Sequence, residues 1–145
     1  MYKNILVATD GSELAGKAVV HALDLAKAVG AHVTAVVVTE PMWNTMPGEM
    51  AIAFPYDEYE RASGERAQAV LAGVADAAKQ HGVGCQGRHV KDQFPAEGII
   101  SAAHEAGCDL IVMASHGRRG LAKLMLGSQA MKVVTSSHVP VLIYR

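Results

Sequence analysis

Two kinds of segment alternate along the chain, distinguished by how apolar and polar positions repeat. The first is a short, nearly continuous apolar run, typical of a strand covered on both faces. Five such runs, the third of them weaker, cover residues 4–9, 33–38, 85–91, 108–113 and 139–144. The second repeats apolar residues at helical spacing, over residues 13–29, 57–80, 95–106 and 129–137. This alternation predicts an α/β fold, a parallel sheet with helices on both faces and right-handed crossovers.

Local signals place the ends and the inner faces of these helices. Ser12 is expected to cap the first helix, Gly30 to end it, and Pro95 to occupy the first position of the third. The predicted inward residues of the first helix are Leu14, Ala15, Ala18, Val19, Ala22, Leu23, Ala26 and Val29. Those of the next two are Ala62, Ala69, Val70, Val74 and Ala77, then Ile99, Ile100, Ala103 and Ala106.

Residues 39–56 break this rhythm, with three prolines, a glycine and the single tryptophan in a stretch without clear period. Connections of this length are usually functional or mobile. Its apolar side chains need a covering surface: a neighbouring subunit, a ligand or the domain itself. They are Met42, Trp43, Met46, Ile52 and Phe54.

The bulk composition narrows the class of protein. The length of 145 residues suits one domain, 1–145, with a single core. A net charge of −1 argues against nucleic-acid binding. No apolar run approaches the roughly 20 residues that span a bilayer, and the amino terminus shows no signal-peptide pattern. We therefore expect a cytoplasmic protein with no membrane partner.

Candidate chemistry gathers after the first and fourth strands, because ligands of such sheets bind beyond the strands' carboxyl ends. The loop between Ala114 and Ser128 joins a strand to a helix start, an arrangement that offers backbone amides to an anion. Gly127 and Ser128 have an alternative explanation as a helix-capping pair, and Asp10 as a turn former. Asp109 lies at the opposite strand end and is expected to be structural.

No catalytic or metal-binding set is recognisable. His116 lies in a loop without an identifiable nucleophile or paired carboxylate, which argues against a general base. His104, His138 and the two cysteines lack metal-ligand spacing.

The chain resembles the universal stress protein family over nearly its whole length. The matching pieces are residues 5–12, 95–100, 109–113, 115–117, 126–128 and 139–143. The ATP-binding branch carries Gly, two residues, Gly, nine residues, Gly, then Ser or Thr. Gly117, Gly127 and Ser128 match this spacing, whereas Ala114 replaces the first glycine.

The resemblance implies a Rossmann-like sheet of the adenine nucleotide alpha hydrolase-like type, ordered 3-2-1-4-5, with ATP and Mg²⁺ between strands one and four. Asp10 would lie on the ribose and adenine side, facing the Gly117–Ser128 loop across a cleft. Val38 and Met113 would frame the base, and Arg118, Arg119 and Lys123 are candidates for neutralising phosphate. The full set of implied ligand residues is Ala8, Thr9, Asp10, Val38, Met113, Ala114, His116, Gly117, Arg118, Gly127, Ser128 and Gln129.

The effect of Ala114 depends on its backbone. If the φ angle of Ala114 is left-handed, alanine costs about 1–2 kcal/mol relative to glycine. If the backbone must touch phosphate, the methyl group of Ala114 blocks that contact. If the φ angle is negative, the replacement of glycine matters little.

The implied strand order also has consequences beyond the site. Residues 139–144 become an apolar sheet edge, which predicts a homodimer with these strands antiparallel across a two-fold axis. Cys85 and Cys108 lie three strand spacings apart, roughly 14 Å, too far for a disulfide.

The sequence thus favours an ATP-binding regulatory or stress-response protein with little or no hydrolysis, not an enzyme. The alternatives are a family member that binds no nucleotide and acts through protein contacts, and a nucleotide-dependent hydrolase or transferase. A phosphoacceptor receiver domain is disfavoured, because the last strand ends in Tyr144-Arg145 without the required lysine.

Overall fold

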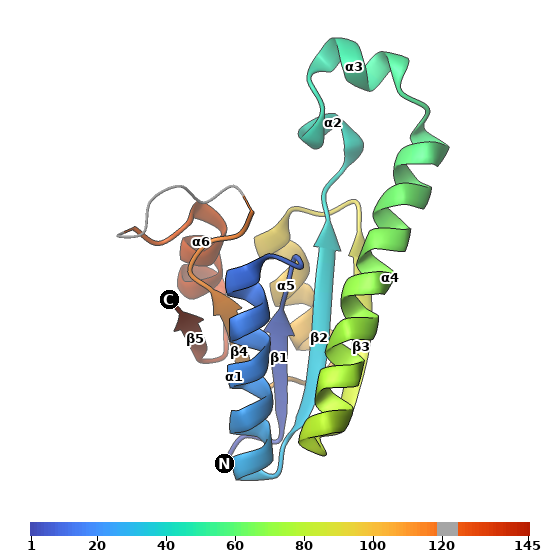
Figure 1. Ribbon diagram of the computed structural model, residues 1–145. Helices are drawn as coiled ribbons and strands as arrows, with labels where there is room; N and C mark the ends of the chain where they lie inside the picture. Colours follow the sequence, from blue (N-terminus) through green and yellow to red (C-terminus); the bar gives the residue numbers. More distant parts are fainter. Residues whose placement is uncertain (119–124) are drawn as a thin grey trace.

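The computed structural model describes residues 1–118 and 125–145. It forms one parallel sheet in the order β3-β2-β1-β4-β5, as predicted (Figure 1). The strands are β1 (Asn4–Ala8), β2 (His32–Thr39), β3 (Cys85–Lys91), β4 (Leu110–Ala114) and β5 (Val141–Tyr144). The helices are α1 (Glu13–Val29), α2 (Met42–Thr45), α3 (Gly48–Ala53), α4 (Tyr56–His81), α5 (Pro95–Glu105) and α6 (Ser128–Ser136).

Helices cover both faces of this sheet, and each strand contributes alternate side chains to each face. In β1, Ile5 and Val7 pack with the buried residues of α1 and α4, whereas Leu6 and Ala8 pack with those of α5 and α6. The four apolar residues of β1, which follow Asn4, are therefore all buried, and this is why the run shows no alternation.

The predicted signals at the helix ends are confirmed. The Ser12 hydroxyl accepts a hydrogen bond from the amide of Ala15 at 3.3 Å, and Pro95 is the first residue of α5. Gly30 ends α1 with a left-handed φ of 71°, a conformation that other residues rarely adopt.

The inner face of α4 differs in part from the prediction. Val74 is buried, and Val70 and Ala77 are half-buried against the core, but Ala62 and Ala69 are exposed. The buried stripe is made by Ser63, Ala67, Leu71, Val74 and Ala78. Alanine fits either face of a helix at little cost, so the alanine-rich pattern of α4 marks its inner face poorly.

The last strand begins later than predicted. It starts at Val141 rather than Val139, although the carbonyl of Pro140 still accepts a hydrogen bond from the amide of Ile111 at 3.0 Å. Its position at the sheet edge is confirmed.

At the amino end of the sheet, Asp109 has the structural role predicted for it. Its carboxylate accepts hydrogen bonds from the amides of Lys3 at 2.8 Å and Asn4 at 3.2 Å. Both cysteines are unpaired, with Cys85 half-buried and Cys108 buried. Within the described ranges, no helix has the length and apolar character needed to cross a membrane.

Candidate functional site

All of the implied ligand residues lie in the described part of the chain and at the carboxyl edge of the sheet. They follow or end β1, β2 and β4, or begin α6. Strand pairing brings these segments together, since Val7 is in register with Val112 and Ala8 with Val36. The strand order reverses between β1 and β4, which is the usual ligand-binding position in sheets of this type.

Asp10 contacts the loop directly instead of facing it across a cleft. One carboxylate oxygen, Oδ1, accepts a hydrogen bond from the amide of Ser12 at 2.9 Å. The other, Oδ2, accepts one from the amide of Arg118 at 3.0 Å. Burial by itself raises the pKa of Asp10, but hydrogen bonds from Ser12 and Arg118 and the Arg118 charge outweigh it, so the pKa is lowered. Asp10 is therefore ionised at neutral pH.

Both matching glycines lie where the backbone passes too close to another group for a side chain. A Cβ on Gly117 would lie 2.7 Å from Oδ2 of Asp10. A Cβ on Gly127 would lie 3.0 Å from the carbonyl oxygen of Ser115, which also accepts the Gly127 amide at 2.8 Å. Neither glycine has a positive φ. Close approach, and not a left-handed turn, therefore explains why glycine suits these positions.

The beginning of α6 offers unoccupied backbone donors. Gly127 is the N-cap residue, and among the described residues no side chain caps this end. The alternative explanation of Gly127 and Ser128 as a capping pair holds for Gly127 only, because Ser128 is the first residue of the helix and its side chain does not cap it. Within residues 1–118 and 125–145, the first amides of α6 therefore lack the side-chain cap that Ser12 gives to α1, and a helix start of this kind favours an anion.

Gln129 is engaged with a neighbouring helix. Its side-chain oxygen accepts a hydrogen bond from the amide of Ala96 at 3.1 Å, in the first turn of α5. Gln129 therefore couples the starts of α5 and α6 and uses its oxygen for this contact.

Ala114 has an ordinary strand backbone. Of the non-glycine residues that the structure describes, Asp92 alone has a positive φ. Ala114 ends β4 and packs with Ala15 and Ala18 of α1. The cost of a left-handed alanine therefore does not arise here.

The residues expected to frame the base lie on the opposite face from this small alanine cluster. Met113 and Ala8 belong to the apolar cluster under α5 and α6, and Val38 packs against it. A Cβ on Gly98 of α5 would lie 2.8 Å from Val38, so α5 sits tightly on β2. Leu126 is half-buried against the same cluster.

The remaining polar candidates for this site are the basic residues of the loop, His116 and a metal-binding cluster. Arg119 and Lys123 lie outside the described residues. The ring nitrogen Nδ1 of His116 is 3.1 Å from the hydroxyl of Ser115, its neighbour. In residues 1–118 and 125–145, no group of three or more His, Cys, Asp or Glu side chains is placed to hold a metal ion.

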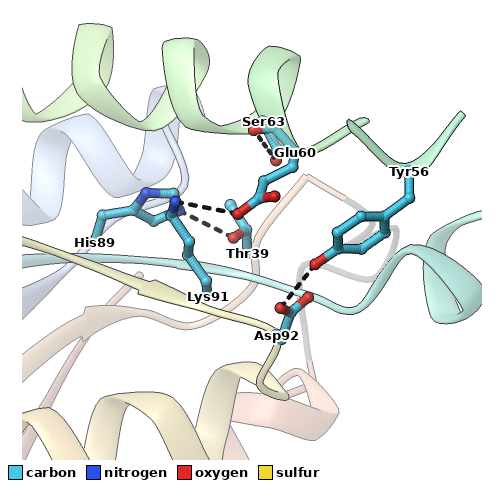
Figure 2. A network of polar contacts seen from close by, with 7 residues as sticks. All are labelled: Thr39, Tyr56, Glu60, Ser63, His89, Lys91 and Asp92. Carbon is cyan, nitrogen blue, oxygen red and sulfur yellow. Dashed lines mark hydrogen bonds and ion pairs between the residues drawn. The ribbon is translucent and has the colours of Figure 1, made fainter. Parts of the chain in front are cut away.

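A second polar cluster, which the sequence did not indicate, lies between the first turns of α4 and the ends of β2 and β3. Figure 2 shows that Tyr56 points toward Asp92 and that Lys91 points toward Glu60. The Tyr56 hydroxyl donates to Oδ2 of Asp92 at 3.1 Å, and Nζ of Lys91 donates to Oε1 of Glu60 at 3.4 Å. His89 is 2.9 Å from the hydroxyl of Thr39. Burial and the nearby Lys91 charge lower the pKa of His89, which favours its neutral form. The residues of this cluster come from three separate segments of the chain and share no motif, so only the folded structure reveals the cluster.

A parallel doubly wound sheet with an uncapped helix start at its switch point defines a class of small α/β binding domains. Within that class, the family model of the universal stress protein family matches residues 1–145, and the chain belongs to this family.

Individual relatives resemble the chain over all or nearly all of their length. A universal stress protein of Thermus aquaticus, from the QAH/OAS sulfhydrylase 3′ region, is 37% identical over 146 residues, covering 100% of both chains. A family structure from Burkholderia pseudomallei has a TM-score of 0.78 at 30% identity, covering 98% of this chain and 95% of the other. A universal stress protein in complex with cAMP has a TM-score of 0.74 at 27% identity, covering 99% and 97%.

Proposed function

We propose that this universal stress protein binds an adenine nucleotide, ATP with Mg²⁺, between the ends of β1 and β4 and acts as a regulatory protein of the cytoplasm. The observation that carries the proposal is the uncapped start of α6, held beside β4 by the Gly127–Ser115 contact. Free amides at a helix N-terminus favour phosphate. The relative that forms a complex with cAMP supports an adenine-containing ligand.

In this proposal, binding exchanges one set of contacts for another. Phosphate would accept from the first amides of α6 and from the Arg118 amide that Asp10 holds in the structure. Asp10, thus released, would accept from the ribose hydroxyls, a role for which an ionised carboxylate is suited. Mg²⁺ would be held through the phosphates. The ring of His116 contacts the hydroxyl of its neighbour Ser115, and the protein is proposed to bind the nucleotide rather than hydrolyse it.

One observation favours the alternative, a family member that acts through protein contacts without nucleotide. The Arg118 amide already has a hydrogen-bond acceptor in Asp10, and Leu126 already packs against the apolar cluster where a ligand would enter. A nucleotide must displace or adjust these contacts, and that requirement lowers its net affinity.

We also propose a homodimer through β5. This strand ends the sheet, and its four residues, Val-Leu-Ile-Tyr, are half-buried. An apolar edge with unpaired backbone groups is stabilised when a second copy pairs with it. Light scattering after size exclusion should give twice the chain mass; a monomer at every concentration would reject the dimer.

The nucleotide proposal is tested by denaturing the purified protein to look for released nucleotide and by titrating ATP calorimetrically with and without Mg²⁺. We expect saturable binding that Gly127→Trp abolishes, because the indole would push the start of α6 away from the backbone of Ser115 and His116. Ala114→Gly should leave the affinity unchanged, since this backbone is not left-handed. Circular dichroism verifies that Gly127→Trp remains folded. Absence of ATP, ADP and AMP binding to the folded wild type would favour the protein-contact alternative, whereas phosphate release above about 1 s⁻¹ would indicate an enzyme.

A further inference from the structure

The segment between β2 and α4 forms two short helices that stand apart from the core. Residues 40–58, termed here the α2–α3 lobe, project beyond the carboxyl edge of the sheet (Figure 1). No residue of α2 or α3 is buried. Large apolar side chains are instead exposed, with Trp43 at 65%, Met50 at 59% and Ile52 at 89%. Of the side chains predicted to need a covering surface, Met42, Met46 and Phe54 are half-buried in the described chain, whereas Trp43 and Ile52 remain exposed.

Specific contacts fix the base of the lobe. The Tyr59 hydroxyl donates to the carbonyl of Glu40 at 2.6 Å, and the Tyr56 hydroxyl donates to Asp92 (Figure 2). The ring of Trp43 meets that of Phe94, at the start of α5, edge-on with centroids 5.8 Å apart. The apolar side chains are thus presented on an anchored segment. Large apolar side chains that stay exposed on an anchored segment are available for contact with a partner.

The charged residues of the lobe are all acidic. The lobe carries Glu40, Glu49, Asp57 and Glu58, and no Lys or Arg occurs between Lys27 and Arg61. The whole chain has a formal net charge of only −1, so acidic charge is concentrated here. A surface that combines exposed apolar groups with carboxylates complements a partner that is apolar and positively charged.

Methionines also suit this surface to a helical partner. Met42, Met46 and Met50 account for three of the seven methionines in the chain. Their flexible, polarisable side chains adapt to apolar partners of varied shape.

We propose that the α2–α3 lobe is a docking surface for a basic amphipathic helix of a partner protein. The apolar face of that helix packs on Trp43 and on one exposed apolar side of α3, because Met50 and Ile52 lie two positions apart and therefore point to opposite sides of that short helix. Its Lys and Arg side chains pair with the carboxylates of the lobe. The acidic charge disfavours an anionic bilayer and a second copy of the lobe itself, because like charges repel. This proposal does not depend on nucleotide binding between β1 and β4.

The single tryptophan makes the lobe directly observable, because all tryptophan fluorescence comes from Trp43. A synthetic Leu/Lys peptide with helical apolar periodicity serves as the probe. We expect a saturable blue shift of the emission as Trp43 loses contact with water, weaker at about 0.5 M salt than at about 0.05 M. A Leu/Glu peptide of the same pattern and a scrambled Leu/Lys peptide should give little response.

Matched variants assign the two parts of the surface. Met50→Ser with Ile52→Ser should weaken peptide binding about tenfold or more by removing apolar contact. Glu49→Lys with Glu58→Lys should weaken it mainly at low salt. Val20→Ser with Val134→Ser, which changes exposed apolar residues of α1 and α6, should have no effect.

The wild-type titrations decide the proposal even if a variant were to misfold. An equal response to the ordered and the scrambled peptide would overturn it. So would a blue shift with phosphatidylserine vesicles or with ATP but not with the peptide, since the lobe would then be a membrane contact or a cover for the nucleotide.

Discussion

Asp10 and Asp109 use their carboxylates in the same way at opposite ends of the sheet. Each accepts hydrogen bonds from two backbone amides, Asp10 from Ser12 and Arg118, and Asp109 from Lys3 and Asn4. The difference lies in what those amides belong to. Asp109 holds the start of β1, and its own amide donates back to the carbonyl of Asn4 at 2.9 Å.

Asp10 holds the N-cap residue of α1, Ser12, and also Arg118, which lies in a turn after β4. The Arg118 amide belongs to no helix or strand, so a phosphate could take the place of the carboxylate without breaking regular structure. The same chemical contact therefore joins the starts of two strands at one end of the sheet, and in the proposed function it is the contact that phosphate would replace at the other.

The largest effect is expected from forcing the carboxyl-end contact apart. Gly117→Val would place side-chain atoms against Oδ2 of Asp10, where even a Cβ would be 2.7 Å away. We expect overpacking of this kind to cost about 1–3 kcal/mol of stability and to weaken ATP binding about tenfold or more. Urea denaturation and calorimetry measure the two effects. Gly16→Ala is the matched control, because nothing lies within 4 Å of its added Cβ. An unchanged ATP affinity in Gly117→Val would show that the loop is not part of the site.

A smaller effect, confined to stability, is expected at the amino end. Asp109→Asn leaves one acceptor oxygen for the amides of Lys3 and Asn4 and removes the charge that strengthens both hydrogen bonds. We expect the free energy of unfolding to fall by about 1–2 kcal/mol, with unchanged nucleotide affinity, as measured by urea denaturation and calorimetry. A loss of binding in the folded variant would contradict the division of roles between the two ends.

The smallest change in stability is expected from the corresponding substitution at the carboxyl end, Asp10→Asn. We expect a loss of about 1 kcal/mol at neutral pH and a several-fold weaker affinity for ATP, because the amide is a poorer acceptor for ribose hydroxyls.

The pH dependence of stability gives a second measurement on this variant. Because the folded pKa of Asp10 is lowered, its contribution is complete above the ordinary value of 3.8 and is lost as the pH falls through the folded pKa. The wild type should therefore lose stability more steeply than Asp10→Asn below about pH 4. Parallel acid-denaturation curves for the two proteins would argue against this role.

The sequence predicted the order of helices and strands because those signals are local. Ser12, Gly30 and Pro95 act on the backbone within a turn of their own positions, and continuous apolar runs mark buried strands without reference to distant residues. The sequence was ambiguous where local chemistry is ambiguous, as in α4, where exposed Ala62 and Ala69 could not be distinguished from buried Ala67 and Ala78.

By itself, then, the amino-acid sequence determined the alternation of elements, the glycine spacing and the family resemblance that carried the strand order. Only the tertiary structure decided how the candidate site is arranged: Asp10 meets Arg118, Gln129 meets Ala96, and Ala114 keeps an ordinary strand backbone. Asp10 and Arg118 are 108 positions apart in the chain. Contacts at that separation depend on which strands are neighbours in the sheet and on how the loops after them approach each other, and no period or capping signal records this.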